Sequence, residues 1–322
     1  MTTFHAIAPW DATLTQAQYL LSLYFIVIAA LALVAAFLRT WITRNEVGPR
    51  YRFAVVARLG VISVASLTYL FMIGLFLGAY DHSDTGYESN DEAVLAFAFR
   101  YMEWSITVPL LCLELLAVCT LVGSAARRVQ RIAASGAFLM IFTGFLGAFI
   151  IGGGEDTSQL LLWGAISSVF WVLTTVVLVR AVKRSMSTLT AESAALLRTA
   201  TMMLLGGWVI YPLVYLIPVF AFGGEWSTTI QITLCTADVV LKIGFGELIH
   251  RVAKLRTAED VRAGEDVHPE SIWISSVKQS DAGVAREVYL AEDSTIHARR
   301  QMPPSSSAVA SASTSDQDSH ED

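Results

Sequence analysis

Seven long apolar runs divide most of this chain and restrict what it can fold into. A helix needs about 20 apolar residues to cross the hydrocarbon core of a bilayer, and every run is at least that long. Hydrophobic residues make up 54% of the 322 residues and charged residues only 16%, a balance that is unusual for a soluble domain. The sequence therefore predicts an all-α membrane protein, a bundle of seven transmembrane helices surrounded by lipid. The runs lie at about 18–43, 52–80, 94–122, 130–153, 157–182, 199–222 and 228–250.

Basic residues mark only one side of the expected membrane. Lys and Arg follow the first, third, fifth and seventh runs, whereas the N-terminal segment and the other three connections contain none. Because cytoplasmic loops carry the excess of positive charge, we expect the N-terminus outside and the C-terminus in the cytoplasm. The first run has neither a basic segment before it nor a cleavage site, so we expect it to remain as a helix.

The composition changes after the last run. Residues 1–256 are expected to form the seven-helix domain, and residues 257–322 a cytoplasmic tail whose Ser-, Ala- and Asp-rich end is disordered. Two β-like runs at 271–277 and 286–291 leave open a short hairpin within 270–292.

A lysine lies near the middle of the seventh run, with an aspartate four residues before it. A charge at this depth costs about 2.5–3.5 kcal/mol on insertion scales and therefore needs a partner. The spacing places Asp238 and Lys242 on one helix face. These residues alone leave two interpretations open: a buried salt bridge between helices, or an amine in an apolar pocket that condenses with an aldehyde to give a Schiff base.

The third run carries a stripe of polar and charged residues at helical spacing. Its two glutamates are roughly 16 Å apart along the axis, too far for a catalytic carboxylate pair. They can be stations on a proton path or simply polar contacts between helices. The stripe consists of Arg100, Glu103, Thr107, Leu111 and Glu114.

These segments together resemble the helices of the microbial rhodopsins, over about residues 15–256. Four motifs carry the resemblance: Arg100-Tyr-x-Glu103-Trp104-x-x-Thr107-x-Pro-Leu-Leu111-x-x-Glu114, Met140-x-x-Thr-Gly144-x-x-Gly, Trp208-x-x-Tyr211-Pro, and Asp238-x-x-x-Lys242-x-Gly-Phe-Gly.

The resemblance implies that Lys242 holds all-trans retinal as a covalent Schiff base. Glu103 and Asp238 become its two counterions, and Arg100 becomes their extracellular partner. Glu114 takes the place of the cytoplasmic proton donor. The remaining pocket residues implied by the resemblance are Trp104, Leu111, Met140, Gly144, Ser167, Trp208, Tyr211 and Tyr215.

Two positions depart from the usual pattern of the family. Gly164 stands where a bulky tryptophan often closes the wall, which is consistent either with simple packing or with an opening to a carotenoid antenna. Arg58 falls in the cytoplasmic half of the second helix, where it either snorkels to the interface or lies buried near Glu114. A buried arginine there, with glutamates at both carboxylate positions of the third helix, resembles the cryorhodopsins of cold-living bacteria.

Two functions follow from the resemblance. In the first, the Schiff base loses its proton in light and a long-lived blue- or UV-absorbing state makes the protein a slow photoswitch or photosensor. In the second, Glu103 accepts the proton, Glu114 resupplies it, and the protein is an outward proton pump. The expected setting is a bacterial plasma membrane, with a trimer or pentamer of the chain and a signalling partner at the tail. No enzyme activity, metal site or nucleic-acid partner is expected.

Overall fold

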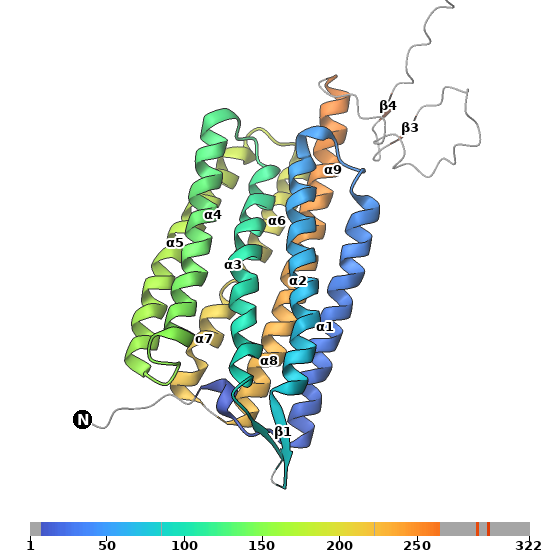
Figure 1. Ribbon diagram of the computed structural model, residues 1–322. Coiled ribbons are helices and arrows are strands. Elements are labelled where there is room, and N and C mark those ends of the chain that lie inside the picture. The colour runs from blue at the N-terminus through green and yellow to red at the C-terminus, as the bar shows by residue number, and fades with distance from the viewer. Residues whose placement is uncertain (1–7, 85, 222, 265–287, 290–294, 297–322) are drawn as a thin grey trace, which may run out of the picture. The chain divides into compact units, whose positions relative to one another are not determined.

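The computed structural model describes residues 8–84, 86–221, 223–264, 288–289 and 295–296. The chain groups into two units, residues 1–271 and 272–322. In the described part of the first unit, the chain passes seven times through a helical bundle, which confirms the predicted fold class (Figure 1). The helices are α1 (Gln16–Thr43), α2 (Arg52–Gly78), α3 (Ala93–Ala117), α4 (Gly123–Phe145), α5 (Thr157–Met186), α6 (Ala191–Gly207), α7 (Ile210–Phe220), α8 (Gly224–Val239) and α9 (Gly246–Arg262).

Six of the described helical spans are long and apolar enough to cross a membrane. The seventh passage consists of α8 and α9 with residues 240–245 between them, and it carries Asp238, Lys242 and Glu247. The six spans are 16–43, 49–78, 93–117, 123–150, 157–186 and 191–220.

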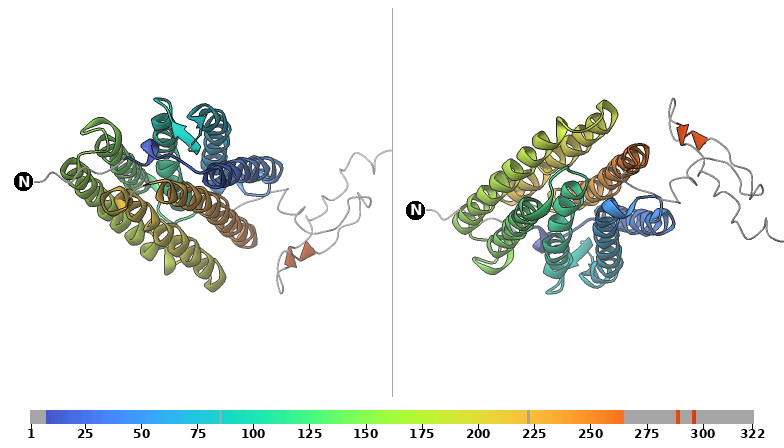
Figure 2. Two further views of the ribbon diagram at one scale, coloured as in Figure 1. Left: turned by 90° about the horizontal axis from the view of Figure 1, so that it is seen from below. Right: turned by 90° about the horizontal axis from the view of Figure 1, so that it is seen from above.

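Neighbours in sequence are neighbours in space through most of the bundle (Figure 2). Contacts run from α1 through α2, α3 and α4 to α5, then through α6 and α7, and α8 packs against α1 to close the ring. Of the two buried apolar clusters among the described residues, the larger takes its members from α2 to α8, from α9 and from the turns beside them.

Local chemistry explains where several helices begin and break. Thr15 and Gln18 form a capping box at the start of α1, and Asp156 accepts backbone hydrogen bonds at the start of α5. The sixth span breaks at Trp208–Val209 because Pro212 cannot donate to the carbonyl four residues earlier. A π-helix (Val240–Phe245) joins α8 to α9 and contains Lys242; single turns of this kind are frequent at functional sites.

A short hairpin that the sequence did not predict covers the extracellular end of the bundle. Strands β1 (Tyr80–Ser83) and β2 (Gly86–Ser89) pair antiparallel, and Tyr87 exchanges two backbone hydrogen bonds of 2.8 Å with Leu14. Gly86 has φ of 137°, and a Cβ there would lie 2.5 Å from the carbonyl oxygen of Leu14, so only glycine fits.

At the cytoplasmic end, α9 continues to Arg262, beyond the expected helix end near residue 250. Its extension contacts three cytoplasmic connections. Arg256 donates to the carbonyl of Val118 at 2.5 Å, and Thr257 accepts from the backbone of Gly48 at 2.9 Å. The carboxylate of Glu259 accepts from hydroxyls at the start of α6.

In the second unit, β3 (Val288–Tyr289) pairs antiparallel with β4 (Thr295–Ile296). The other strand of the hairpin expected within 270–292, at 271–277, lies outside the described residues, as does the Ser-rich end of the tail.

Candidate functional site: a buried lysine between two carboxylates

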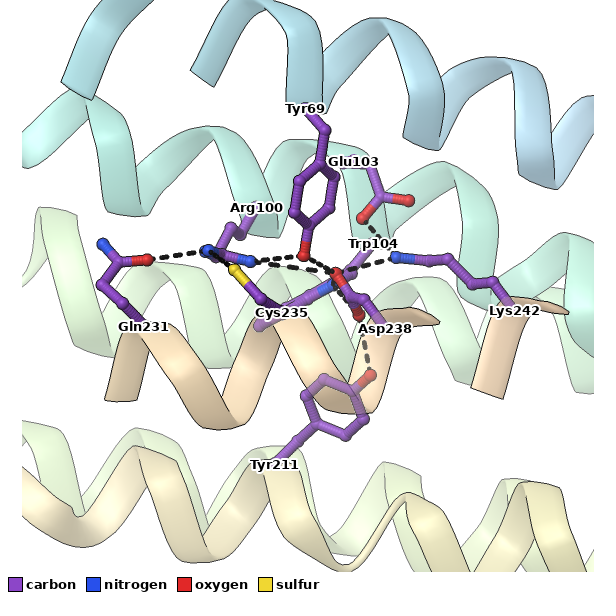
Figure 3. Close-up of polar contacts among 9 residues, drawn as sticks. All are labelled: Tyr69, Arg100, Glu103, Trp104, Tyr211, Gln231, Cys235, Asp238 and Lys242. Atoms are coloured by element: carbon purple, nitrogen blue, oxygen red, sulfur yellow. Dashed lines mark hydrogen bonds and ion pairs between the residues drawn. The ribbon is translucent and has the colours of Figure 1, made fainter. Parts of the chain in front are cut away.

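Lys242 lies between two carboxylates from two different helices (Figure 3). Its Nζ is 2.9 Å from Oε2 of Glu103 on α3 and 2.9 Å from Oδ2 of Asp238, one turn earlier in its own segment. All three side chains are at most 2% exposed. Burial of this group is tolerable because each charge has an opposite charge in contact.

The two carboxylates differ in how well they are satisfied. Asp238 accepts from the hydroxyls of Tyr69 and Tyr211, both at 2.8 Å, and from the indole nitrogen of Trp104 at 3.2 Å. Glu103 accepts a hydrogen bond from Lys242 through Oε2, and its Oε1 is buried without a hydrogen-bond partner among the described residues. Of the two, Glu103 is the carboxylate better able to accept a proton, because no hydrogen-bond donor stabilises the charge on its second oxygen.

Arg100 supplies the second positive charge on the extracellular side of the pair. Its Nη1 donates to the hydroxyl of Tyr69 at 2.7 Å and lies 3.9 Å from Asp238. Its Nη2 donates to Gln231 at 2.7 Å and to the sulfur of Cys235 at 3.2 Å. Two cations therefore balance two carboxylates in a site closed to solvent.

Sequence reasoning missed Tyr69, Gln231 and Cys235 as partners of Arg100. A usable signal existed for two of them: Gln231, Cys235 and Asp238 recur at helical spacing on one face of the last helix. The part played by Tyr69 depends on how α2 is rotated against α3, which no pattern within one helix reveals.

A cavity of about 330 Å³ is lined by Lys242 at one place, within the range of about 300–1,000 Å³ typical of small-molecule sites. Most of its walls are apolar or aromatic, which suits a long apolar ligand attached at the lysine. The predicted residues that line it are Arg100, Trp104, Leu111, Met140, Gly144, Ser167, Trp208, Tyr211, Tyr215, Asp238 and Lys242.

The two cavity glycines named in the sequence analysis, Gly144 and Gly164, are in contact with other side chains. A Cβ on Gly144 would lie 3.5 Å from the ring of Tyr101. At Gly164 the ring of Tyr215 already fills the space, since a Cβ there would lie 2.7 Å from its Cε1. Tyr215 is fixed by the hydrogen bond of 3.0 Å that its hydroxyl donates to the carbonyl of Leu160.

Four predicted residues do not line this cavity: Glu103 beside Lys242 and, towards the cytoplasm, Thr107, Glu114 and Arg58. Thr107 and Glu114 are both buried, and neither oxygen of Glu114 has a hydrogen-bond partner among the described residues. Arg58 is also buried, so the snorkelling interpretation is wrong. Its Nη2 donates to Glu247 at 3.1 Å, a partner that the sequence did not indicate.

Arg58 and Glu114 approach each other across a glycine. A Cβ on Gly246 would lie 3.0 Å from Nε of Arg58 and 3.4 Å from Oε1 of Glu114. Glu247 meanwhile also accepts from Arg39 at 2.6 Å, so that one carboxylate is shared by a buried and an exposed arginine.

Fold and site together define a seven-helix membrane protein with a lysine buried between two carboxylates at the end of an aromatic cavity. Residues 20–255 match the model of the bacteriorhodopsin-like protein family, and the chain belongs to that family. Its members work within the lipid bilayer, bind retinal through a Schiff-base lysine, and act as light-driven pumps or sensors rather than as enzymes.

Known relatives are similar along most of their length. A green-light absorbing proteorhodopsin from Gamma-proteobacterium EBAC31A08 is 25% identical over 231 residues, 69% of this chain and 82% of the relative. Archaerhodopsin-3 from Halorubrum sodomense is 25% identical over 240 residues, 71% and 83% of the two chains. Among solved structures, xanthorhodopsin, described as a light-driven ion pump with dual chromophore, has a TM-score of 0.67 at 28% identity, covering 77% of this chain and 98% of that one. A thermophilic rhodopsin has a TM-score of 0.70 at 26% identity and the same coverage.

Proposed function

We propose that this chain carries all-trans retinal on Nζ of Lys242 and acts as a slow photoswitch or photosensor in a bacterial plasma membrane. The retinal supplies light absorption and, once isomerised, makes the proton at Nζ available for transfer. The observation that carries the sensor assignment is Arg58, a buried permanent charge next to Glu114.

Glu103 is the proposed acceptor of the proton from Nζ. Its Oε2 is 2.9 Å away, and the carboxylate has an unpartnered oxygen, whereas Asp238 is held by Tyr69, Tyr211 and Trp104. Asp238 and Arg100 therefore remain as the fixed charges of the site. Trp104 and Trp208 are proposed to enclose the chromophore, with the other cavity residues completing its walls.

The return of the proton from the cytoplasm is proposed to be slow. A group that resupplies a proton must hold it beforehand, and a guanidinium that never loses its charge favours the ionised form of Glu114 instead. Glu114 would then have no proton to give, and the return would wait on entry from the cytoplasm. This combination of Arg58 with Glu103 and Glu114 is the basis for assigning the chain to the cryorhodopsin subgroup.

An outward proton pump is the second candidate. One observation favours it: burial of Glu114 without any hydrogen-bond partner favours the neutral carboxyl, and Glu247 offsets part of the charge of Arg58. With a protonated Glu114, the stripe on α3 would connect the cytoplasmic half to Lys242 and Glu103. The relative described as a light-driven ion pump agrees with this alternative.

We do not extend the proposal to a carotenoid at Gly164. The solved relative has a dual chromophore, but here the ring of Tyr215 fills the space beside this glycine. Packing is therefore the interpretation that we favour for Gly164, and a second chromophore would require Tyr215 to turn away.

The photosensor proposal also includes protein partners: further copies of this chain and a signalling protein. A trimer or pentamer of the chain would present several cytoplasmic tails together, and a signalling partner is proposed to bind the tail from residue 257 onward. The seven-helix domain at 1–256 would then be the light-sensing part and the tail the output.

Flash photolysis of the purified pigment, together with light-driven pH changes in cells, tests the proposal. We expect a visible absorption band on addition of retinal, recovery of the dark state over seconds or longer, and little acidification of the medium. Failure to form any visible band would contradict the retinal assignment, whereas recovery within milliseconds with strong acidification would favour the pump.

Glu103→Gln is expected to shift the visible band, because it removes one of the two negative charges beside Nζ. Acidifying the wild type should move the band to the red as the Glu103/Asp238 pair gains a proton, and the variant should respond differently to acid. Absorption spectra across a pH series measure both effects. Glu225→Gln, which changes an exposed extracellular carboxylate, is the matched control. If neither acid nor Glu103→Gln changes the spectrum, Glu103 is not a counterion.

A further inference from the structure

A second group of titratable side chains lies at the cytoplasmic ends of α1, α2 and α9, outside the retinal cavity. At its centre is His250, which is 6% exposed. Nε2 of His250 is 3.3 Å from Oε2 of Glu46, which also accepts from Lys254 at 2.8 Å. The other ring nitrogen, Nδ1, is buried and has no hydrogen-bond partner among the described residues. The imidazole thus has one satisfied nitrogen and one unsatisfied nitrogen.

The cluster leads inward to the proposed proton path. His250 and Gly246 are one turn apart on α9, and Gly246 is where Arg58 and Glu114 approach each other. Nε and Nη1 of Arg58 and both oxygens of Glu114 are buried without partners. Several unsatisfied polar atoms in one place are the setting in which proteins hold buried water, so a water-filled link between His250 and Glu114 is expected here.

The exposed fraction of the side chains falls from Glu46 at the surface to Glu114 in the interior. The side chain of Glu46 is 35% exposed and that of Glu247 is 26% exposed. His250 is 6% exposed and Glu114 only 1%. A series that starts in solvent and ends at a buried carboxyl is the arrangement that proton entry from the cytoplasm requires.

Charged side chains face His250 from several neighbouring parts of the bundle. Glu46 lies in the connection after α1, Arg58 on α2 and Glu114 on α3. The described buried face of α6 carries no titratable side chain. Arg39 of α1 reaches the cluster through Glu247, and α9 itself contributes Glu247 and Lys254.

Glu46 remains charged at neutral pH. Burial opposes its ionisation, but the hydrogen bonds that Lys254 and His250 make with it hold the pKa of Glu46 below its ordinary value. An ionised Glu46 attracts protons from the cytoplasm and positions the outer nitrogen of His250.

We propose that His250 is the relay through which protons enter from the cytoplasm towards Glu114, an inference that rests on the proposed light-driven proton transfer. The neutral ring has its proton on Nε2, where it donates to ionised Glu46. A proton that enters from cytoplasmic water binds Nδ1 to give the imidazolium, which the charge of Glu46 stabilises. The same proton then leaves Nδ1 inward towards Glu114, and the ring is again neutral with its proton on Nε2.

His250→Gln tests the relay, because an amide can still bond to Glu46 but cannot carry a proton. Dark-state recovery should slow by about tenfold, a modest part of the roughly 10²–10⁴-fold that a positioned proton-transfer group contributes. The wild-type recovery rate should change with pH around the titration of a histidine, and this dependence should disappear in the variant. His82→Gln, an exposed histidine of the extracellular hairpin, is the control and should change neither result.

Nitrogen NMR of histidine-labelled protein in the dark provides a readout that is independent of the photocycle. One histidine signal that titrates should be lost in His250→Gln and shifted in Glu46→Gln. A variant with a normal visible band, unchanged recovery and an unchanged pH profile would overturn the relay and leave the proposed function standing. Absence of a light cycle in the wild type would instead overturn the proposed function. Should His250→Gln fail to fold, unchanged recovery in Glu46→Gln would count against the relay.

Discussion

Lys242→Ala is expected to abolish the visible absorption band that retinal gives with the wild-type protein. Of the described residues that line the cavity, Lys242 is the single lysine, and its Nζ is held at the end of the apolar space. No other side chain there has the primary amine that condenses with an aldehyde. Absorption spectra before and after addition of all-trans retinal measure the effect.

A loss of colour must be separated from a loss of fold. Removing the lysine leaves Glu103 and Asp238 buried with only Arg100 to compensate them, and breaking a buried ion pair in this way costs about 3–5 kcal/mol. Lys242→Arg is the matched variant, because it keeps the positive charge but cannot form the Schiff base. Both variants should lack the band, and the arginine variant should keep more of the thermal stability. A visible band in either folded variant would end the retinal assignment at Lys242.

The seven-helix architecture was predictable because each membrane helix is indicated by its own continuous apolar run in the sequence. Each run satisfies its own backbone hydrogen bonds, so its length and composition are enough to indicate a membrane helix. The stripe on the third helix and the Asp238–Lys242 pair were visible for the same reason, since each follows the period of a single helix. The capping box at Thr15 belongs to the same class of local signal.

Contacts between helices were harder to predict because they depend on how each helix is rotated about its axis. Arg58 could be placed near Glu114 only through the family resemblance, and its bond to Glu247 on α9 was missed. The bond from Tyr69 to Asp238 was missed in the same way. The length of α9 was underestimated because its polar extension is held by contacts to loops, such as the bond from Arg256 to Val118, and not by lipid.

Arg58→Ala is expected to speed recovery of the dark state, and this variant separates sensor from pump. A guanidinium near a buried carboxyl favours the ionised form of that carboxyl, even where a second carboxylate partly offsets its charge. Glu247 keeps Arg39 as a partner at 2.6 Å, so the substitution does not leave it unpaired. Without Arg58, burial favours the protonated form of Glu114, which can then resupply a proton.

The acceleration should reach at least about tenfold, which requires only about 1.4 kcal/mol of the barrier. Flash photolysis gives the rate, and infrared difference spectra should gain the carbonyl band of a protonated Glu114. Arg58→Lys should keep most of the slow recovery, and Arg52→Ala, at an exposed position six residues earlier, should recover like the wild type. If the wild type itself recovers within milliseconds and acidifies the medium strongly under continuous light, Arg58 does not hold Glu114 ionised. The compensation by Glu247 is then sufficient, and the protein is a pump.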